Sequence, residues 1–302
     1  MNNHKILVVD DYKKEFFDEL ARYGEVVKAT KIDDHPQLGD VNILVVRSKT
    51  KVDEKLVGRM RNLKCVISAT HGTDHVSVDY LTEKGIKFYN VPVQSYDIAQ
   101  GVMAYILAQS TKLLEGDRSM KRGEWKKKEL RGFRIKGKTL GIIGYGRIGK
   151  AVARMASALK MKVVAYDPYV KGTEFAVTLD ELLETSDFIT IHVPLTKETK
   201  GMIGKNEISK MKDGAYLINT ARGGIIDERA LLNALNEGKL SGAALDVYGQ
   251  QQPFENEVSN RLAKDERVIA TPHSIGQTIE AIEEKGEGVI EIIKRLHLEE
   301  PP

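Results

Sequence analysis

The chain has 302 residues, of which 41% are hydrophobic and 29% are charged, and its formal net charge is +3. This length is large for one hydrophobic core, so we expect two domains, and the small, interspersed charge favours neither a nucleic-acid nor a membrane partner. The sequence has no apolar run of the roughly 18 residues that a transmembrane helix needs, and its N-terminal apolar run is too short for a signal peptide. Cys65 is the only cysteine, so neither an intrachain disulfide nor a metal site is expected, and we expect a cytoplasmic protein.

Short apolar runs alternate with amphipathic segments through the first third of the chain. The expected strands are residues 6–9, 26–27, 43–46, 66–67 and 86–89, and the expected helices are residues 12–23, 53–60 and 78–84. Such an alternation of strands and helices predicts a parallel sheet that is covered by helices.

The pattern changes after Pro92. A long helical stretch, residues 97–114, precedes a basic segment, residues 117–138, whose lysine run at 126–128 is interpreted as a solvated face rather than as part of a site for a phosphorylated substrate. A second series follows, with strands expected at residues 139–143, 162–166, 188–192, 215–219, 242–246 and 268–271, and a last helix at residues 278–298.

The predicted fold class is therefore α/β, with two doubly wound parallel-sheet domains. We expect a Rossmann nucleotide-binding domain, residues 93–274, to be inserted in a flavodoxin-like substrate domain, residues 1–92 and 275–302. Because no strand follows the last helix, we expect that helix to pack back on the first domain.

A glycine-rich turn follows the first strand of the second series. It has the pattern GxGxxG and lies between an apolar strand and an Ala-rich helix, which is the context of a dinucleotide-binding turn. Gly144 permits the tight turn, Gly146 the approach of a pyrophosphate, and Gly149 close packing of helix and strand. The free N–H groups at the start of the helix favour an anion. The predicted phosphate cradle comprises Gly144, Tyr145, Gly146, Arg147, Ile148 and Gly149.

An acidic residue, Asp167, ends the next predicted strand, about 20 residues beyond the glycines. A carboxylate at this position accepts hydrogen bonds from the ribose hydroxyls of NAD and repels the 2′-phosphate of NADP. We therefore predict that NAD is the cofactor.

Three later segments place functional groups after predicted strands, at the edge where ligands of such sheets bind. These groups are Arg222, Asp246 and His273. Hydride transfer to a keto acid needs a cation for the carboxylate and carbonyl oxygens, and an acid for the developing alkoxide. The planar, permanently charged guanidinium of Arg222 suits the first task. Histidine ordinarily titrates near neutrality, which suits His273 to the second.

These motifs resemble those of the D-isomer-specific 2-hydroxyacid dehydrogenases, and most of all those of the phosphoglycerate dehydrogenases among them. The resemblance covers nearly the whole chain and is most specific at residues 192–201, 220–224, 245–247 and 271–273. It implies that Arg222 grips the substrate's carboxylate and keto oxygen, that His273 is the acid–base, and that Asp246 contacts the nicotinamide carboxamide. Further contacts are implied with the cofactor for His192, Val193, Pro194, Thr199, Thr220, Ala221 and Gly276, and with the substrate for Arg47, Ser48, Thr70, His71 and Gly72.

The sequence departs from the family pattern five residues after Asp246. The family usually has a glutamate there, which hydrogen-bonds the catalytic histidine and raises its pKa, whereas this chain has Gln251. An amide can fix the orientation of an imidazole but supplies no charge to it. Formate dehydrogenases of the same superfamily resemble the chain in this glutamine, although the rest of their substrate pattern is absent from it.

The resemblance implies an NAD-dependent oxidoreductase that acts on a small D-2-hydroxy or 2-keto acid and forms a homodimer. The favoured substrate is 3-phosphoglycerate, which would place the protein in serine biosynthesis, and the alternative is glyoxylate or hydroxypyruvate. A formate-type dehydrogenase and a non-catalytic protein that senses NAD are less favoured. The last has only Gln251 in its support, and Arg222 and His273 argue against it.

Overall fold

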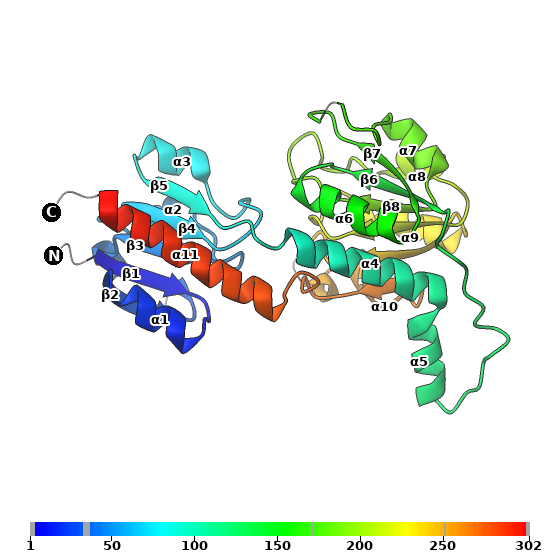
Figure 1. Cartoon of the computed structure of the whole chain (residues 1–302), viewed down its shortest axis with the longest axis horizontal. Coiled ribbons are helices and arrows are strands. Elements are labelled where there is room, and N and C mark those ends of the chain that lie inside the picture. Colours follow the sequence, from blue (N-terminus) through cyan, green and yellow to red (C-terminus); the bar gives the residue numbers. More distant parts are fainter. Residues whose placement is uncertain (1–3, 33–36, 171, 251, 300–302) are drawn as a thin grey trace. The chain divides into compact units, whose positions relative to one another are not determined.

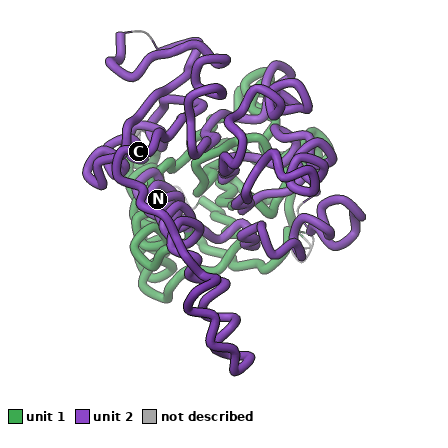
Figure 2. The backbone as a smooth tube through the Cα atoms, turned by 90° about the vertical axis from the view of Figure 1, so that its right-hand side faces the viewer, with its two compact units in different colours: residues 1–94, 277–302 green, residues 95–276 purple. Residues whose placement is uncertain are grey.

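The computed structural model describes residues 4–32, 37–170, 172–250 and 252–299. The chain divides into two compact units, one formed by Met1–Gln94 together with Gln277–Pro302, and the other by Ser95–Gly276 (Figure 2). The boundaries expected from the sequence lie two residues earlier in each case. The assignment of the first unit to the substrate and the second to the cofactor stays a prediction at this stage.

The first unit is built on a five-stranded parallel sheet of order β2-β1-β3-β4-β5. This is the flavodoxin-like order, and it agrees with the predicted fold class. The strands are β1 (His4–Val9), β2 (Gly24–Ala29), β3 (Ile43–Val46), β4 (Cys65–Ser68) and β5 (Lys87–Asn90).

Helices cover both faces of this sheet, because successive residues of β1 point to opposite sides. Ile6 and Val8 pack against α1 (Lys14–Leu20) and α11 (Ile279–Glu299), which lie together on one face (Figure 1). Leu7 and Val9 pack against α2 (Glu54–Val57) and α3 (Val78–Glu83) on the other face. The last helix of the chain therefore belongs to the first unit, and a short 3-10 helix, Leu38–Asp40, completes that unit.

The second unit contains a six-stranded parallel sheet of order β11-β10-β9-β8-β6-β7. Its strands are β6 (Thr139–Ile143), β7 (Lys162–Tyr166), β8 (Phe188–Ile191), β9 (Ala215–Asn219), β10 (Leu240–Leu245) and β11 (Val268–Ala270). The chain runs from β6 outward to β7, then returns past β6 to β8 and continues in the opposite direction. This reversal is the double winding of the Rossmann class.

Helices also cover both faces of the second sheet. One face carries α4 (Ser95–Thr111) and α6 (Arg147–Ala158), and the other carries α7 (Leu179–Thr185), α8 (Lys205–Lys210), α9 (Glu228–Asn236) and α10 (Glu257–Lys264) (Figure 1). The 3-10 helix Pro253–Glu255 precedes α10. Among the described residues, none of the helices has the length and apolar character that crossing a membrane requires.

The helix that was expected over residues 97–114 is interrupted in the structure. Lys112 adopts a left-handed conformation, with φ 57°, which ends α4 and begins a separate helix α5 (Leu113–Lys121). The α5 helix leaves α4 at a steep angle, and a long loop leads from its end back to β6 (Figure 1). Sequence periodicity missed this break because it does not depend on a glycine or a proline.

Candidate functional site

The carboxyl ends of the six strands in the second unit are aligned in register. The paired end residues are Tyr166 with Ile143, Ile143 with Ile191, Ile191 with Asn219, Asn219 with Leu245, and Leu245 with Ala270. The next residue of each strand, taken across the sheet, is Asp167, Gly144, His192, Thr220, Asp246 and Thr271. Five of these six were predicted site residues, so the fold gathers them along one edge of roughly 24 Å, given a strand spacing of about 4.8 Å.

The winding reverses between β6 and β8, where Gly144 and His192 lie side by side. Their contact is close, because a Cβ atom on Gly144 would lie 2.6 Å from the carbonyl oxygen of His192. In open parallel sheets, ligands bind in the crevice beyond the strand ends at this reversal. The glycine-rich turn therefore stands at the position that the fold class provides for a ligand.

Each of the three glycines in the turn suits its position for a different structural reason. Gly144 has φ 94°, which other residues rarely adopt, and a Cβ on Gly149 would lie 2.2 Å from the oxygen of Gly144. At Gly146, the residue that precedes α6, a Cβ would meet nothing within 4 Å. The fold itself thus requires two of the glycines, while the third leaves open space at the start of a 12-residue helix. Free N–H groups and open space at a helix start fit a diphosphate.

The carboxylate of Asp167 is held in place beside this turn. Its Oδ2 accepts the backbone N–H of Tyr145 at 2.8 Å, and its Oδ1 accepts that of Tyr169 at 2.9 Å. A carboxylate can accept about four hydrogen bonds, so capacity remains for two ribose hydroxyls. The geometry fits the predicted role of Asp167.

His192 is a neutral residue of the switch point. Its Nε2 lies 3.0 Å from the hydroxyl of Thr190, while its Nδ1 is buried without a hydrogen-bond partner among the described residues. Burial lowers the pKa of the imidazole from 6.5 to about 3. The side chain therefore carries no charge near neutral pH, and it is the backbone of His192 that lies against Gly144.

We expect His192 to make stability depend on pH. The imidazole binds a proton below pH 6.5 in the unfolded chain but only below about 3 in the folded one. Its contribution to stability is therefore complete above pH 6.5 and is lost as pH falls from 6.5 towards 3. From pH 7 to pH 5, this group should lower the free energy of unfolding by about 2 kcal/mol. Urea unfolding at pH 7 and pH 5 would measure the free energy of unfolding of the wild type and of His192→Gln. Between these two pH values the variant should lose less of this free energy than the wild type, by about 2 kcal/mol. Equal losses in the two proteins would contradict the expectation.

Arg222 stands in a tight loop after β9. The Asn219 side chain ties this loop together, because its Oδ1 accepts the N–H of Ala221 at 3.0 Å and its Nδ2 donates to the carbonyl of Arg222 at 2.9 Å. A Cβ on Gly223 would lie 1.6 Å from the oxygen of Tyr248, and Gly224 has φ 80°. Sequence reasoning missed the role of Asn219, although an asparagine at a strand end before a glycine pair favours such a turn.

His273 stands in the loop that follows β11, and its backbone is strained. Its φ of 56° lies in the left-handed region, at a cost of about 1–2 kcal/mol for such a residue. The buried Asp246 carboxylate spans this residue, since its Oδ1 accepts the hydroxyl of Thr271 and the N–H of Ser274 at 2.9 Å. The Asp246 Oδ2 also accepts the N–H of Ile275, at 3.3 Å. Asp246 therefore has a structural task that the sequence did not indicate, in addition to its predicted contact with the cofactor.

The remaining predicted residues of this unit lie close to the same edge. The hydroxyl of Thr199 donates to the carbonyl of Pro194 at 2.6 Å, which closes the loop after β8. Val193 packs against Gly144, and Gly276 is buried at the end of the loop that carries His273. Gln251 lies outside the described residues.

The predicted substrate residues lie at the carboxyl edge of the first sheet. Arg47 and Ser48 follow β3, and Thr70, His71 and Gly72 follow β4, its neighbour. The hydroxyl of Thr70 donates to the carbonyl of Gly72 at 2.7 Å, which closes a tight turn. An Arg47 nitrogen lies 3.6 Å from a carboxylate oxygen of Asp10, which follows β1 and was not predicted. The sequence did offer a sign of Asp10, which is a polar residue directly after an apolar run that predicts a buried strand.

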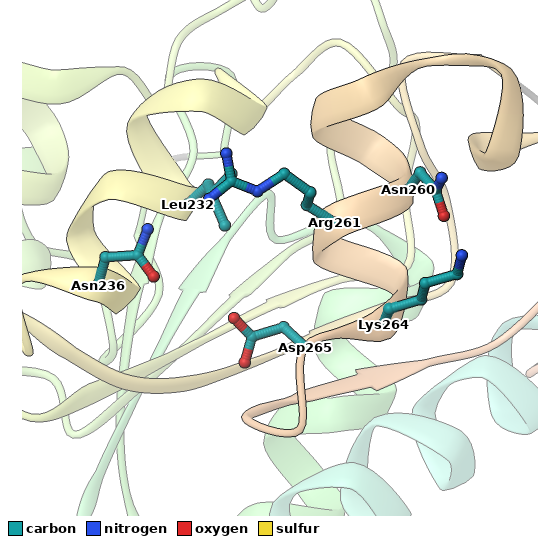
Figure 3. A pocket seen from close by; sticks show the side chains of 6 residues that line it. All are labelled: Leu232, Asn236, Asn260, Arg261, Lys264 and Asp265. Atoms are coloured by element: carbon teal, nitrogen blue, oxygen red, sulfur yellow. The ribbon is translucent and has the colours of Figure 1, made fainter.

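A surface pocket lies elsewhere on the second unit, between α9 and α10 (Figure 3). It is lined by Leu232, Asn236, Asn260, Arg261, Lys264 and Asp265. Asp265 precedes β11 by three residues, so the pocket is at the amino ends of the strands. It contains none of the predicted site residues. No group of side chains within the described ranges could hold a metal ion.

A parallel sheet with a glycine-rich turn at its switch point, and a carboxylate after the neighbouring strand, defines a dinucleotide-binding domain. The family model for the D-isomer specific 2-hydroxyacid dehydrogenase, NAD binding domain, matches residues 103–274. The chain belongs to this family, and NAD is the cofactor that the family's domain binds.

Known relatives carry several names. The chain is 40% identical to the D-3-phosphoglycerate dehydrogenase of Methanocaldococcus jannaschii over 97% of its own length and 57% of that protein's. It is 42% identical to the hydroxypyruvate reductase of Thermotoga maritima over 99% of both. A solved D-lactate dehydrogenase from Aquifex aeolicus, complexed with NAD and lactic acid, superposes with a TM-score of 0.89 at 32% identity, covering 97% of this chain and 95% of that one. The chain thus spans only 57% of the phosphoglycerate dehydrogenase of Methanocaldococcus jannaschii and 54% of that of Archaeoglobus fulgidus.

Proposed function

We propose that the protein transfers a hydride between NAD(H) and a small D-2-hydroxy acid or its 2-keto acid. The observation that carries this proposal is the register of the second sheet. It puts the segments of Arg222 and His273 after β9 and β11, on the same edge as the glycine-rich turn. These two strands flank β10, so a spacing of about 10 Å separates them, which a small acid and the two side chains can bridge.

Each residue then has a defined task. The guanidinium fork of Arg222 binds the carboxylate and the keto oxygen, and orients the carbonyl carbon. During reduction His273 donates its proton to the substrate oxygen, and during oxidation it takes that proton back. The nicotinamide, when bound, supplies or accepts the hydride at the same carbon. The Gly144–Gly149 turn and Asp167 hold the diphosphate and the ribose.

The favoured substrate is 3-phosphoglycerate, supported by the phosphoglycerate dehydrogenases among the relatives. With this substrate, the protein would act in serine biosynthesis in the cytoplasm. Hydroxypyruvate or glyoxylate is the second candidate, favoured by the hydroxypyruvate reductase that matches over 99% of both chains.

Steady-state assays would decide between these candidates. NADH oxidation should be measured with phosphohydroxypyruvate, hydroxypyruvate, glyoxylate and pyruvate, and NAD reduction with formate. The highest kcat/KM should fall on one of the first three acids. If none of these substrates is turned over, the proposal fails and a protein that only senses NAD becomes the better reading.

We further propose that a second copy of the chain covers the region around α5. Apolar side chains are exposed there, with Leu113 61%, Met120 58% and Trp125 77% accessible. Patches of this kind commonly mark interfaces. Light scattering of the purified protein should give the mass of a homodimer, and a monomer at micromolar concentration would contradict the proposal.

The Asp167 carboxylate should make the enzyme prefer NADH to NADPH. A 2′-phosphate would lie beside a fixed negative charge that Tyr145 and Tyr169 hold in position, so we expect a ratio of kcat/KM of at least about 100. Asp167→Ala should reduce this ratio by weakening NADH use more than NADPH use. Equal use of the two cofactors by the wild type would exclude the ribose role of Asp167.

Glutamine at position 251 should lower the pH at which reduction slows. A neutral amide lacks the charge that favours imidazolium, so Gln251→Glu should move the acid–base limb of kcat/KM for keto-acid reduction to higher pH. The comparison needs pH–rate profiles of both proteins in both directions. An unchanged limb would show that position 251 does not act on His273.

A further inference from the structure

A buried hydrogen-bond chain links α4 to the loop of His273. Tyr105, on α4, is 3% exposed, and its hydroxyl is hydrogen-bonded to the hydroxyl of Thr271. The Thr271 hydroxyl is in turn bonded to Oδ1 of Asp246, which is 2% exposed. Tyr105 and Asp246 therefore lie at the two ends of a chain with Thr271 in its middle.

The direction of this chain follows from the number of protons available. A threonine hydroxyl has one proton, and Thr271 gives it to the carboxylate, which can only accept. Tyr105 must therefore donate to the oxygen of Thr271. Burial, the largest cause, raises the pKa of Tyr105 far above its ordinary value, so the hydroxyl keeps its proton.

The carboxylate at the end of the chain also fixes the backbone on the far side of His273. Its Oδ1 accepts the N–H of Ser274 at 2.9 Å and that of Ile275 at 3.4 Å. A residue in the left-handed region keeps that conformation only where its surroundings over-determine it. The bonds to Thr271, Ser274 and Ile275, on both sides of His273, provide this constraint.

A second contact from α4 reaches the same loop. A Cβ on Gly101 would lie 2.1 Å from Cγ1 of Ile275, so the helix and the loop touch closely there. Gly101 and Tyr105 are four residues apart and share one face of α4. This face therefore contacts the His273 loop at Ile275 and at Thr271.

We propose that Tyr105 is a positioning residue for His273, acting through Thr271 and Asp246 rather than by contact with the substrate. The inference rests on the proposed function, in which His273 moves the proton. A proton donor must be placed to within a fraction of an ångström of its productive position. The tie to α4 provides that placement from the backbone.

The test uses Tyr105→Phe, Thr271→Val, Thr271→Ser and the double variant Tyr105→Phe/Thr271→Val. Tyr105→Phe and Thr271→Val should each lower kcat for keto-acid reduction by about tenfold or more. The Kd for NADH should change much less, by about threefold at most, since the glycine-rich turn and Asp167 are untouched and Asp246 keeps its carboxylate for the predicted nicotinamide contact. Thr271→Ser should restore most of the rate because it keeps the hydroxyl. The double variant should be no slower than Thr271→Val, because both changes break one chain.

Tyr216→Phe is the matched control, because Tyr216 is also buried in the second unit and stacks on Phe188. Its kcat should stay within about twofold of the wild type. A Tyr105→Phe variant with a kcat equally close to wild type would overturn the inference, and so would losses that add in the double variant. If Tyr105→Phe fails to fold, Thr271→Val and Thr271→Ser are compared instead. A kcat of Thr271→Val equal to that of Thr271→Ser would then overturn the inference.

Histidine NMR separates this inference from the proposed function. The ring signal of His273 can be assigned among the seven histidines by its loss in His273→Asn. If the wild type turns over no keto acid, the proposed function fails, but Tyr105→Phe should still shift or broaden this signal and Tyr216→Phe should not. An unmoved His273 signal in an inactive protein would overturn the inference.

Discussion

Arg222→Lys should lower kcat/KM for the 2-keto acid by about 100-fold or more, and should leave NADH binding nearly unchanged. The reason is geometric. A guanidinium presents two parallel N–H donors to a carboxylate, whereas an ammonium is a single charge on a flexible stem. The loop is built to hold this residue, since Asn219 bonds its carbonyl and Gly223 packs against Tyr248. Steady-state kinetics with the best substrate, together with NADH titration by fluorescence, would measure both effects.

Arg229→Lys provides the control for this substitution. Arg229 is an exposed residue of α9, close to Arg222 in sequence but outside the predicted site. Its kcat/KM should stay within about twofold of the wild type, as is usual for surface changes. If Arg222→Lys were equally mild, Arg222 would not grip the substrate, and the proposed reaction would lose its anion-binding group.

His273→Asn should reduce kcat by about 100-fold to 10 000-fold, the range that general acid–base catalysis contributes. Asparagine suits this test because it tolerates the left-handed backbone better than most residues. At φ 56° the loop and its bonds to Asp246 can therefore remain while the imidazole is lost. The pH dependence of the residual rate should lose the limb that the histidine causes.

The exposed histidine of α11, His297, gives the matching control. His297→Asn should keep the full rate and the full pH profile. A His273→Asn variant that also kept both would remove the proton donor from the mechanism. Retention of formate oxidation alone, which needs no proton donor, would point to the formate-type alternative.

Local sequence chemistry determined the fold class and the position of the cofactor turn. Short apolar runs such as residues 43–46 and 139–143 predict strands from local sequence alone, and the structure has strands at both. The GxGxxG turn is equally local, since its glycines are required by the strand that precedes the turn and the helix that follows it. Such patterns can be read along the chain because the interactions that enforce them span only a few residues.

Only the tertiary structure decided how the functional segments meet. The alignment of six strand ends depends on backbone pairing between distant segments, which no local pattern specifies. The break at Lys112 arises in a residue without a marked turn preference, and the left-handed backbone of His273 is held by the hydrogen bonds that the distant Asp246 accepts from Thr271 and Ser274. The bond between Tyr105 and Thr271 joins residues 166 positions apart. A tyrosine on an apolar helix face predicts burial, and it is the packing of α4 against the loop after β11 that gives its hydroxyl a partner.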